Sequence, residues 1–237
     1  SDMIASAKSD KTREKIEKEL GIRKADTNAQ VVDFADVVFL AVKPQFLEGV
    51  LDEIRDSVKA GQIFISIAPG KTLQWLGERL GENTKVIRTM PNTPAMVGEG
   101  MTALCVNELV TEEEIALAVK LCDTFGKTEV IPEHLMDAVV GVSGSSPAYV
   151  FMFLEAMADA AVADGMPRAQ AYKFAAQSVL GSAKLMLETG KHPGELKDMV
   201  CSPAGTTIQA VRVLEEKGLR SAVIEAQTVC VKKAKGI

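Results

Sequence analysis

The chain is poor in the residues that build metal sites and disulfide frameworks. It has only two histidines, His134 and His192, and no Cys-x-x-Cys pair among its four cysteines. Two histidines are too few for a typical histidine metal cluster, and scattered cysteines argue against a zinc site or a set of disulfides. Free cysteines suit a reducing compartment, so we expect a cytoplasmic protein without a metal site.

Long hydrophobic runs and an excess of positive charge are missing too. No apolar run approaches the roughly 20 residues that span a bilayer, and the first residues lack the basic region and apolar core of a secretory signal. The net charge of −5 gives no hint of nucleic acid or an anionic membrane as partner. The 237 residues, 47% of them hydrophobic, allow one large or two modest domains.

The first part of the chain, residues 1–131, alternates strand and helix patterns. Val37–Val42 and Gln62–Ala68 are continuous apolar runs, which are typical of strands buried on both faces. Strands separated by helices predict a parallel sheet with helices on both faces. The predicted strands are 3–7, 37–42, 62–68, 85–89, 101–106 and 128–131, and the predicted helices are 11–20, 46–58, 73–80 and 111–125.

After Pro132 the strand pattern stops, and residues 132–237 predict helices only. Ala148–Asp164 is apolar nearly all round, so this helix must be buried in a core or against another subunit. About 105 residues give little room to bury it alone, which predicts a homo-oligomer. The sequence therefore predicts an α/β domain followed by an all-α domain. The predicted helices are 135–142, 148–164, 168–187, 193–200, 207–217 and 221–235.

The glycine-rich phosphate loop of a nucleotide-binding domain is absent. A doubly wound domain of the Rossmann type normally begins with a strand and G-x-G-x-x-G, and no such motif occurs in this sequence. Met3–Ala7 looks like the second strand of such a domain, so about one βα unit of a roughly 30-residue βαβ piece is missing. We expect either a truncated chain or a sequence that gives only part of it.

Unusual residues follow several predicted strands at their carboxyl ends, where such folds bind ligands. Ser6 and Lys8 follow the first strand, where an acidic residue would select NAD by binding the ribose 2′-hydroxyl. A hydroxyl and a cation instead suit a 2′-phosphate, although an ordinary solvated helix start explains them equally well. Further loops follow the next three strands: Ala41-Val42-Lys43-Pro44, Ile67-Ala68-Pro69-Gly70 and Met90-Pro91-Asn92-Thr93-Pro94.

A second candidate site lies at Ser202–Thr207, a loop of small residues that opens a helix. Pro203 stiffens the entry, and Gly205 lets a ligand approach the backbone. The N–H groups at the start of the helix favour an anion such as a carboxylate. Taken alone, the segment is better explained as an ordinary loop and helix cap.

In this order the motifs resemble those of the pyrroline-5-carboxylate reductases, from about residue 3 to the end. The resemblance implies hydride transfer from NADPH, or from NADH, to the C5=N bond of Δ1-pyrroline-5-carboxylate, giving L-proline in the last step of proline biosynthesis. It also implies an NAD(P)-binding domain over 1–131 and a helical substrate-binding domain over 132–237 that dimerises, with dimers often assembled into decamers. The motifs are Ala41–Pro44, Met90–Ala95, Gly98–Leu104, Ser143–Tyr149, His192–Asp198 and Ser202–Thr207.

The resemblance also implies roles for individual residues. For the cofactor they are Ser6 and Lys8 near the adenosine 2′-phosphate, Asn28 near the adenosine, and Ala41, Val42, Lys43, Pro44, Ala68 and Pro69 along the crevice. For the substrate carboxylate and ring they are Ser202, Gly205, Thr206 and Thr207, with Thr207 as hydrogen-bond donor or proton relay. Ser146 and Ala204 replace glycines of the family's motifs, which costs strain wherever φ is positive.

Two alternatives remain open. One is a related imine or β-hydroxyacid reductase, such as an enzyme like 6-phosphogluconate dehydrogenase. Such enzymes carry a catalytic lysine on the long helix after the nucleotide-binding domain, and Ala148–Asp164 has no lysine. The other is an oligomeric fragment of a reductase that cannot hold its cofactor, because the glycine-rich loop is absent.

Overall fold

The structure, a computed structural model, describes residues 2–236. It divides into two compact units, which are residues 2–144 with 231–236 and residues 145–230. The predicted α/β part followed by a helical part is confirmed. The predicted boundary at residue 131 stays a prediction, and residues 1 and 237, the outer limits of the predicted domains, lie outside the described residues.

The first unit contains two sheets. In the smaller one, β1 (Ile4–Ala5) pairs in parallel with β2 (Arg23–Lys24). The larger sheet has the order β3-β4-β5-β6-β7, and β3, β4 and β5 are parallel to one another. Its strands are β3 (Val37–Leu40), β4 (Ile63–Ser66), β5 (Lys85–Met90), β6 (Gly100–Val106) and β7 (Gly126–Val130).

The prediction of an all-parallel sheet is wrong at β6. This strand runs antiparallel to β5, with Ile87 opposite Val106, while β6 and β7 are again parallel. A parallel pair needs a crossover of a dozen or more residues, usually a helix. Only residues 91–99 join β5 to β6, and they hold a single 3-10 turn, Thr93–Val97. The short connection therefore forces the chain to reverse.

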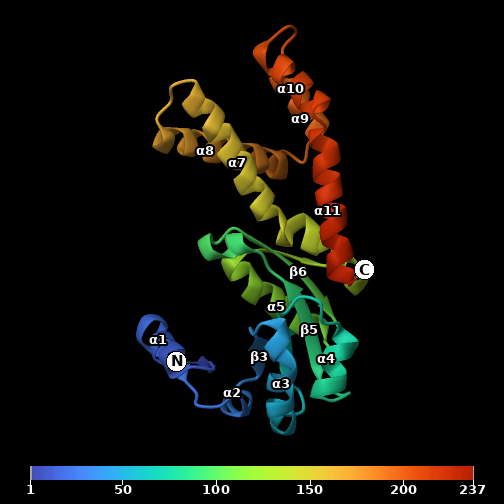
Figure 1. Ribbon diagram of the computed structural model, residues 1–237. Coiled ribbons are helices and arrows are strands. Elements are labelled where there is room, and N and C mark those ends of the chain that lie inside the picture. The colour runs from blue at the N-terminus through green and yellow to red at the C-terminus, as the bar shows by residue number, and fades with distance from the viewer. Residues whose placement is uncertain (1, 237) are drawn as a thin grey trace. The chain divides into compact units, whose positions relative to one another are not determined.

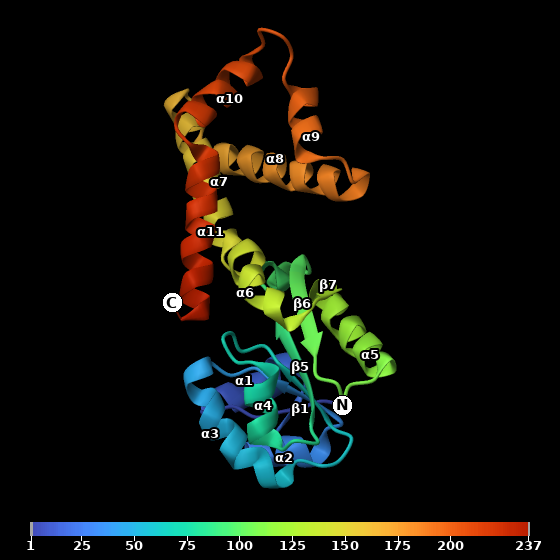
Figure 2. The same ribbon diagram turned by 90° about the vertical axis from the view of Figure 1, so that its right-hand side faces the viewer.

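Helices cover both faces of the larger sheet, as predicted (Figures 1 and 2). Phe64 of β4 packs with α2, α3 and α4 in one core cluster, whereas its neighbours Ile63 and Ile65 pack with α5 in another. This division follows from the alternation of side chains along a strand. The helices are α1 (Asp10–Leu20), α2 (Asn28–Phe34), α3 (Pro44–Ile54), α4 (Leu73–Leu80), α5 (Glu112–Cys122) and α6 (Met136–Val139).

The sequence analysis missed β2 and α2. β2 has only two residues, both exposed and basic, so it carries no apolar strand pattern. α2 has seven residues with one buried, Val32, and begins at the cap Thr27, whose hydroxyl accepts a hydrogen bond from the Gln30 N–H. Both elements are too short for hydrophobic periodicity to reveal them.

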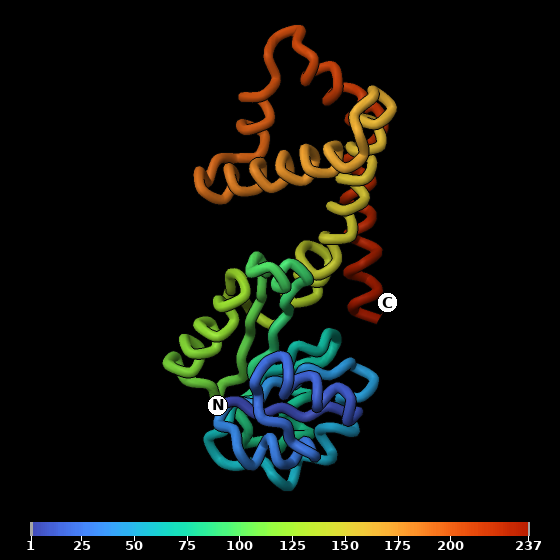
Figure 3. The backbone as a smooth tube through the Cα atoms, turned by 90° about the vertical axis from the view of Figure 1, so that its left-hand side faces the viewer, coloured from blue at the N-terminus to red at the C-terminus, as the bar shows by residue number. Residues whose placement is uncertain are grey.

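The second unit is helical, and Figure 3 follows its backbone from α7 to α11. The side chains buried on α7 and α8 are three alanines: Ala158 on the first, and Ala171 and Ala175 on the second. Much larger apolar side chains of these helices are exposed, among them Phe151, Met152, Phe174 and Leu187. The helices are α7 (Ser146–Ala163), α8 (Arg168–Thr189), α9 (Pro193–Val200), α10 (Thr206–Glu216) and α11 (Leu219–Lys235).

One stretch, Glu133–Ala163, is long and apolar enough to cross a membrane by length and composition alone. It includes α7, whose apolar surface led the sequence analysis to expect a partner subunit. A helix buried between subunits shows the same composition as a membrane span, so the stretch is weak support for a membrane protein.

Candidate nucleotide and substrate sites

A cavity of about 870 Å³ lies in the first unit between its two sheets. β1 and β3 both line it, and neither has a second strand partner on that side among the described residues. The order β2-β1, then β3-β4-β5, matches a dinucleotide-binding sheet of order 3-2-1-4-5-6, with the cavity at the place of strand 1. The cavity thus adjoins the carboxyl ends of strands that bind dinucleotides in this fold.

The structure brings four of the predicted cofactor residues together. Ser6, Asn28, Ala41 and Val42 all line the cavity. The other five residues do not line it: Lys8, Lys43, Pro44, Ala68 and Pro69. Of these, Lys43 and Pro44 form the start of α3, Ala68 is buried in the core, and Lys8 and Pro69 are exposed.

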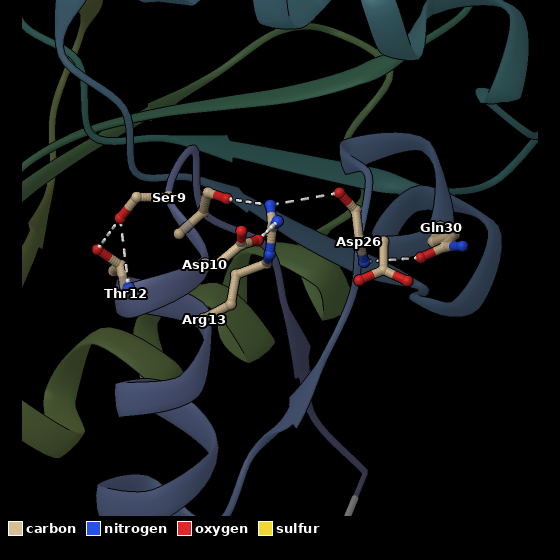
Figure 4. A network of polar contacts seen from close by, with 7 residues as sticks. Ser9, Asp10, Thr12, Arg13, Asp26 and Gln30 are labelled. Carbon is tan, nitrogen blue, oxygen red and sulfur yellow. Dashed lines mark hydrogen bonds and ion pairs between the residues drawn. The ribbon is translucent and has the colours of Figure 1, made fainter.

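Lys8 and Arg13 are two of the cations that follow β1 in the sequence, and the structure separates their roles. The Arg13 guanidinium donates to the carbonyl oxygens of Ala7 and Asp26, at 2.8 and 3.5 Å, and forms an ion pair with Asp10 (Figure 4). Arg13 therefore fastens the segments that follow β1 and β2. The Lys8 ammonium lies 5.1 Å from the ring centre of Phe46 on α3 and stays exposed, so it is the better candidate for a phosphate contact.

Glu133 contacts two other segments of the first unit. One Glu133 carboxylate oxygen accepts from the buried Arg88 at 3.1 Å and from the Leu73 N–H at 2.7 Å. It therefore caps α4 and compensates a buried charge. Burial, with a smaller effect of Glu133, raises the pKa of the nearby Cys105 thiol to about 12, so this thiol stays protonated.

The Ser202–Thr207 loop has the local geometry of an anion site. α9 ends at Val200, and α10 begins at Thr206, one residue earlier than predicted. The residue before it, Gly205, has no side chain to cap the helix, so no side-chain cap covers the first-turn N–H groups. Those groups and the Thr206 and Thr207 hydroxyls can contact a carboxylate.

Gly205 lies close to Ser202 within this loop. Its N–H donates to the Ser202 carbonyl oxygen at 3.1 Å. A Cβ on Gly205 would lie only 2.3 Å from the Ser202 hydroxyl oxygen. It would also lie 3.1 Å from the Ser202 carbonyl oxygen, so a side chain here would displace the hydroxyl and crowd the backbone.

Ser146 and Ala204, which replace glycines of the family's motifs, differ in backbone strain. Ser146 is the first residue of α7, and its φ is not positive, so a side chain is tolerated there. Ala204 has φ of 59° and is the only non-glycine residue with positive φ within 2–236. An alanine in this left-handed conformation costs about 1–2 kcal/mol. The predicted strain is therefore present at Ala204 and absent at Ser146.

Comparisons with known proteins agree with these motifs. The family model described as pyrroline-5-carboxylate reductase dimerisation matches residues 133–237. The *Escherichia coli* K12 pyrroline-5-carboxylate reductase is 59% identical over 91% of this chain and 80% of its own length. The chain belongs to the pyrroline-5-carboxylate reductase family. A second family model, NADP oxidoreductase coenzyme F420-dependent, matches residues 1–70.

The family extends across distant organisms and includes close structural matches. The enzyme of *Methanosarcina acetivorans* is 47% identical over 89% of this chain and 78% of its own length. The crystal structure from *Streptococcus pyogenes* has a TM-score of 0.90 at 37% identity, covering 99% of this chain and 89% of that one. A *Plasmodium falciparum* pyrroline carboxylate reductase with NADP bound has a TM-score of 0.88 at 28% identity, covering 98% and 86%.

The residues beside the cavity fit the adenosine half of a dinucleotide. Ser6 and Asn28 offer a hydroxyl and an amide, Lys8 offers a cation nearby, and Ala41 and Val42 leave room for a flat group. The glycine-rich turn that would hold the pyrophosphate does not occur in the sequence given. The fit therefore concerns the adenosine end.

Proposed function

We propose that this protein reduces Δ1-pyrroline-5-carboxylate to L-proline with a reduced nicotinamide cofactor, the last step of proline biosynthesis. The observation that carries the proposal is the identity to the *E. coli* reductase, 59% over 91% of this chain. The uncapped start of α10 supports it, because the substrate carries a carboxylate. The alternative of a β-hydroxyacid reductase requires a catalytic lysine on the long helix after the nucleotide-binding domain. That helix is α7, and it has no lysine.

In this proposal the Ser202–Thr207 loop orients the substrate. The N–H groups of Thr206 and Thr207 bind the substrate carboxylate. Ser202 and Gly205 contact the substrate ring. Reduction adds a hydride to C5 and leaves the C=N electron pair on the nitrogen, which carries a proton. The cofactor, when bound, supplies the hydride. The Thr207 hydroxyl donates a hydrogen bond to the lone pair that hydride addition leaves on the ring nitrogen, or relays the proton that this nitrogen carries, so the site supplies orientation more than acidity.

Variants of Thr207 test this role. Thr207→Val removes the hydroxyl at nearly constant volume, and we expect kcat/KM for pyrroline-5-carboxylate to fall about 100-fold, within the range of a positioned proton donor. Thr207→Ser keeps the hydroxyl and should retain most of the activity. Thr189→Ala, at the end of α8, is a control that should leave the kinetics unchanged. Equal kinetics of the valine and serine variants would remove Thr207 from this role.

NADPH is the proposed cofactor, in preference to NADH. The family model over residues 1–70 and the exposed ammonium of Lys8 support it. Lys8→Ala should lower kcat/KM for NADPH several-fold more than for NADH, since only NADPH carries the 2′-phosphate. Lys15→Ala, which removes an exposed cation of α1 that pairs with Glu19, is the matched control. An unchanged NADPH-to-NADH ratio in Lys8→Ala would contradict the preference.

We further propose that the protein works in the cytoplasm as a homodimer formed by its second unit, with decamers built from dimers. The dimerisation model over 133–237 and the exposed apolar side chains of α7 and α8 support an assembly of identical chains. Light scattering after size exclusion separates monomer, dimer and decamer by mass.

The first test of the activity is a spectrophotometric assay. Purified protein is mixed with NADPH, and the absorbance of the reduced nicotinamide is followed before and after pyrroline-5-carboxylate is added. Oxidation that depends on the substrate is the expected result. Absence of oxidation at any substrate concentration would contradict the proposal and favour a fragment that cannot hold its cofactor.

A further inference from the structure

Glu53, on α3, makes a two-pronged contact with one residue of the cavity wall. One carboxylate oxygen accepts from the backbone N–H of Asn28 at 3.1 Å, and the other accepts from the Asn28 side-chain nitrogen at 2.6 Å. The third polar atom of Asn28, its side-chain oxygen, accepts from the Ser6 hydroxyl at 2.5 Å. Through Asn28, these hydrogen bonds connect three segments: the residues after β1, the start of α2 and the end of α3.

The chemistry of the carboxylate decides how the Asn28 amide is oriented. An ionised carboxylate only accepts hydrogen bonds, so the amide NH₂ must point to Glu53. The amide oxygen then faces Ser6, which lines the cavity with Asn28. Without a carboxylate at position 53, the amide can turn over and present its NH₂ to Ser6 instead. Glu53 thus makes Asn28 present its side-chain oxygen, a hydrogen-bond acceptor, rather than its NH₂ group on the side of Ser6 and the cavity.

The backbone contact has a separate physical reason. Asn28 is the first residue of α2, so its N–H has no partner within the helix. A carboxylate at a helix N-terminus also interacts favourably with the helix dipole. Glu53 therefore fixes both the start of α2 and the side chain that α2 places at the cavity.

We propose that Glu53 is a positioning residue for the adenosine end of the cofactor, acting through Asn28 and Ser6. This inference rests on the proposed cofactor site. The fixed Asn28 oxygen accepts a hydrogen bond from a donor group of the adenosine, and the Ser6 hydroxyl is held beside the ribose. Nothing in the sequence pattern separates Glu53 from the other exposed acidic residues of α3, and only its contacts reveal this role.

The experiment compares Glu53→Gln with Asp52→Asn. Both variants remove one negative charge from exposed neighbouring positions of α3, but only Glu53 contacts Asn28. The probe is adenosine 2′-monophosphate, which carries the adenosine and the 2′-phosphate without pyrophosphate or nicotinamide. Its dissociation constant is measured by NMR titration of the full chain, together with the chemical shift of the Asn28 side-chain amide.

We expect Glu53→Gln to weaken probe binding about tenfold, as the loss of an interaction with a charged partner does. The Asn28 amide resonance should shift in this variant, while Asp52→Asn should bind the probe within about twofold of the unchanged protein. In turnover, Glu53→Gln should raise KM for NADPH with little change in kcat, the pattern of lost ground-state binding. A merely structural role would lower thermal stability and leave the dissociation constant and KM unchanged.

Three results would overturn the proposal: no binding of the probe to the unchanged protein, equal binding to Glu53→Gln, or equal weakening by Asp52→Asn. These outcomes are separate from the reductase assay. Turnover of pyrroline-5-carboxylate without an effect of Glu53→Gln on the probe contradicts only the role of Glu53. Probe binding that depends on Glu53, without turnover, contradicts only the proposed activity.

Discussion

Strand β4 of the first unit and the long first helix of the second, α7, are both apolar, yet they are buried very differently. All four residues of β4 are buried inside their own unit. α7 has 18 residues, of which only Ala158 is buried. β4 is covered on both faces by helices of the same chain, whereas α7 is covered by little more than α8. Apolar composition therefore marks an internal core in one unit and an interface between chains in the other.

The difference implies that the first unit is stabilised by contacts within one chain, and the second by contacts with another chain. The first unit encloses its own core, so changes in that core should act on the folding of each chain. The second unit leaves many large apolar side chains exposed, among them Phe151, Phe174 and Leu187. Changes there should act on assembly. The predictions below test this division, from the largest expected effect to the smallest.

The largest effect is expected at Phe151 of α7, which is 61% exposed. Phe151→Lys places a charge in the apolar surface, and we expect the oligomer to dissociate, because a buried unpaired charge costs several kcal/mol. The matched control is Leu20→Lys on α1, at a side chain that is 65% exposed in the first unit. Light scattering should show a monomer for the first variant only. An unchanged mass for Phe151→Lys would contradict the assignment of this surface of α7 to an interface between chains.

The next effect is expected in the core of the first unit. Phe64→Ala should lower the free energy of unfolding by about 3–5 kcal/mol, because it removes a fully buried ring of β4. Phe174→Ala on α8, where the ring is 67% exposed, should change the unfolding of the dissociated chain by less than about 0.5 kcal/mol. Urea titration at low protein concentration measures both. Similar losses for the two variants would contradict the division.

A moderate effect is expected at Gly205. Gly205→Ala should raise KM for pyrroline-5-carboxylate about tenfold, because the new Cβ collides with the Ser202 hydroxyl and shifts the loop. Gly181→Ala on α8 is the control, since a Cβ there meets nothing within 4 Å. That control should leave KM unchanged and leave stability equal or slightly higher. An unchanged KM for Gly205→Ala would place the substrate elsewhere.

The smallest effect is expected from the Lys85–Glu114 ion pair of the first unit. The Lys85 ammonium, 2.5 Å away, holds the pKa of the Glu114 carboxyl below its ordinary value of 4.5. The pair therefore stabilises the folded state above that pH, and its contribution is lost as the pH falls. Lys85→Met should cost about 1 kcal/mol or less at pH 7, and the difference from the unchanged protein should shrink in unfolding experiments below pH 4.5. A difference that does not depend on pH would point to packing instead.

Most of the fold could be predicted from local patterns. α4 and α9 have the predicted bounds, Leu73–Leu80 and Pro193–Val200, and α1 is capped by Ser9 and ends at Gly21, which has a φ of 63°. These features depend on residues close in sequence, through periodicity and capping. The antiparallel β6 was predicted wrongly, because strand direction depends on the length of the connection and on the partner strand.

The candidate sites divide in the same way. The family resemblance predicted a cofactor role for Ser6 and Asn28, and both line one cavity in the structure. It did not reveal Glu53, because a glutamate that orients another residue has no pattern of its own. Nor could it divide the cations Lys8 and Arg13 between a ligand and the protein's own carbonyl groups.

The sequence by itself determined most of the helices and strands and the family, but not β2 or α2. The tertiary structure decided strand direction, the cavity between β1 and β3, and which apolar surfaces are left for another chain. The physical reason is distance along the chain. Helix caps and side-chain periodicity arise within a few residues. Burial brings together residues that are far apart in the sequence. The two hydrogen bonds between Glu53 and Asn28, for example, join residues 25 positions apart.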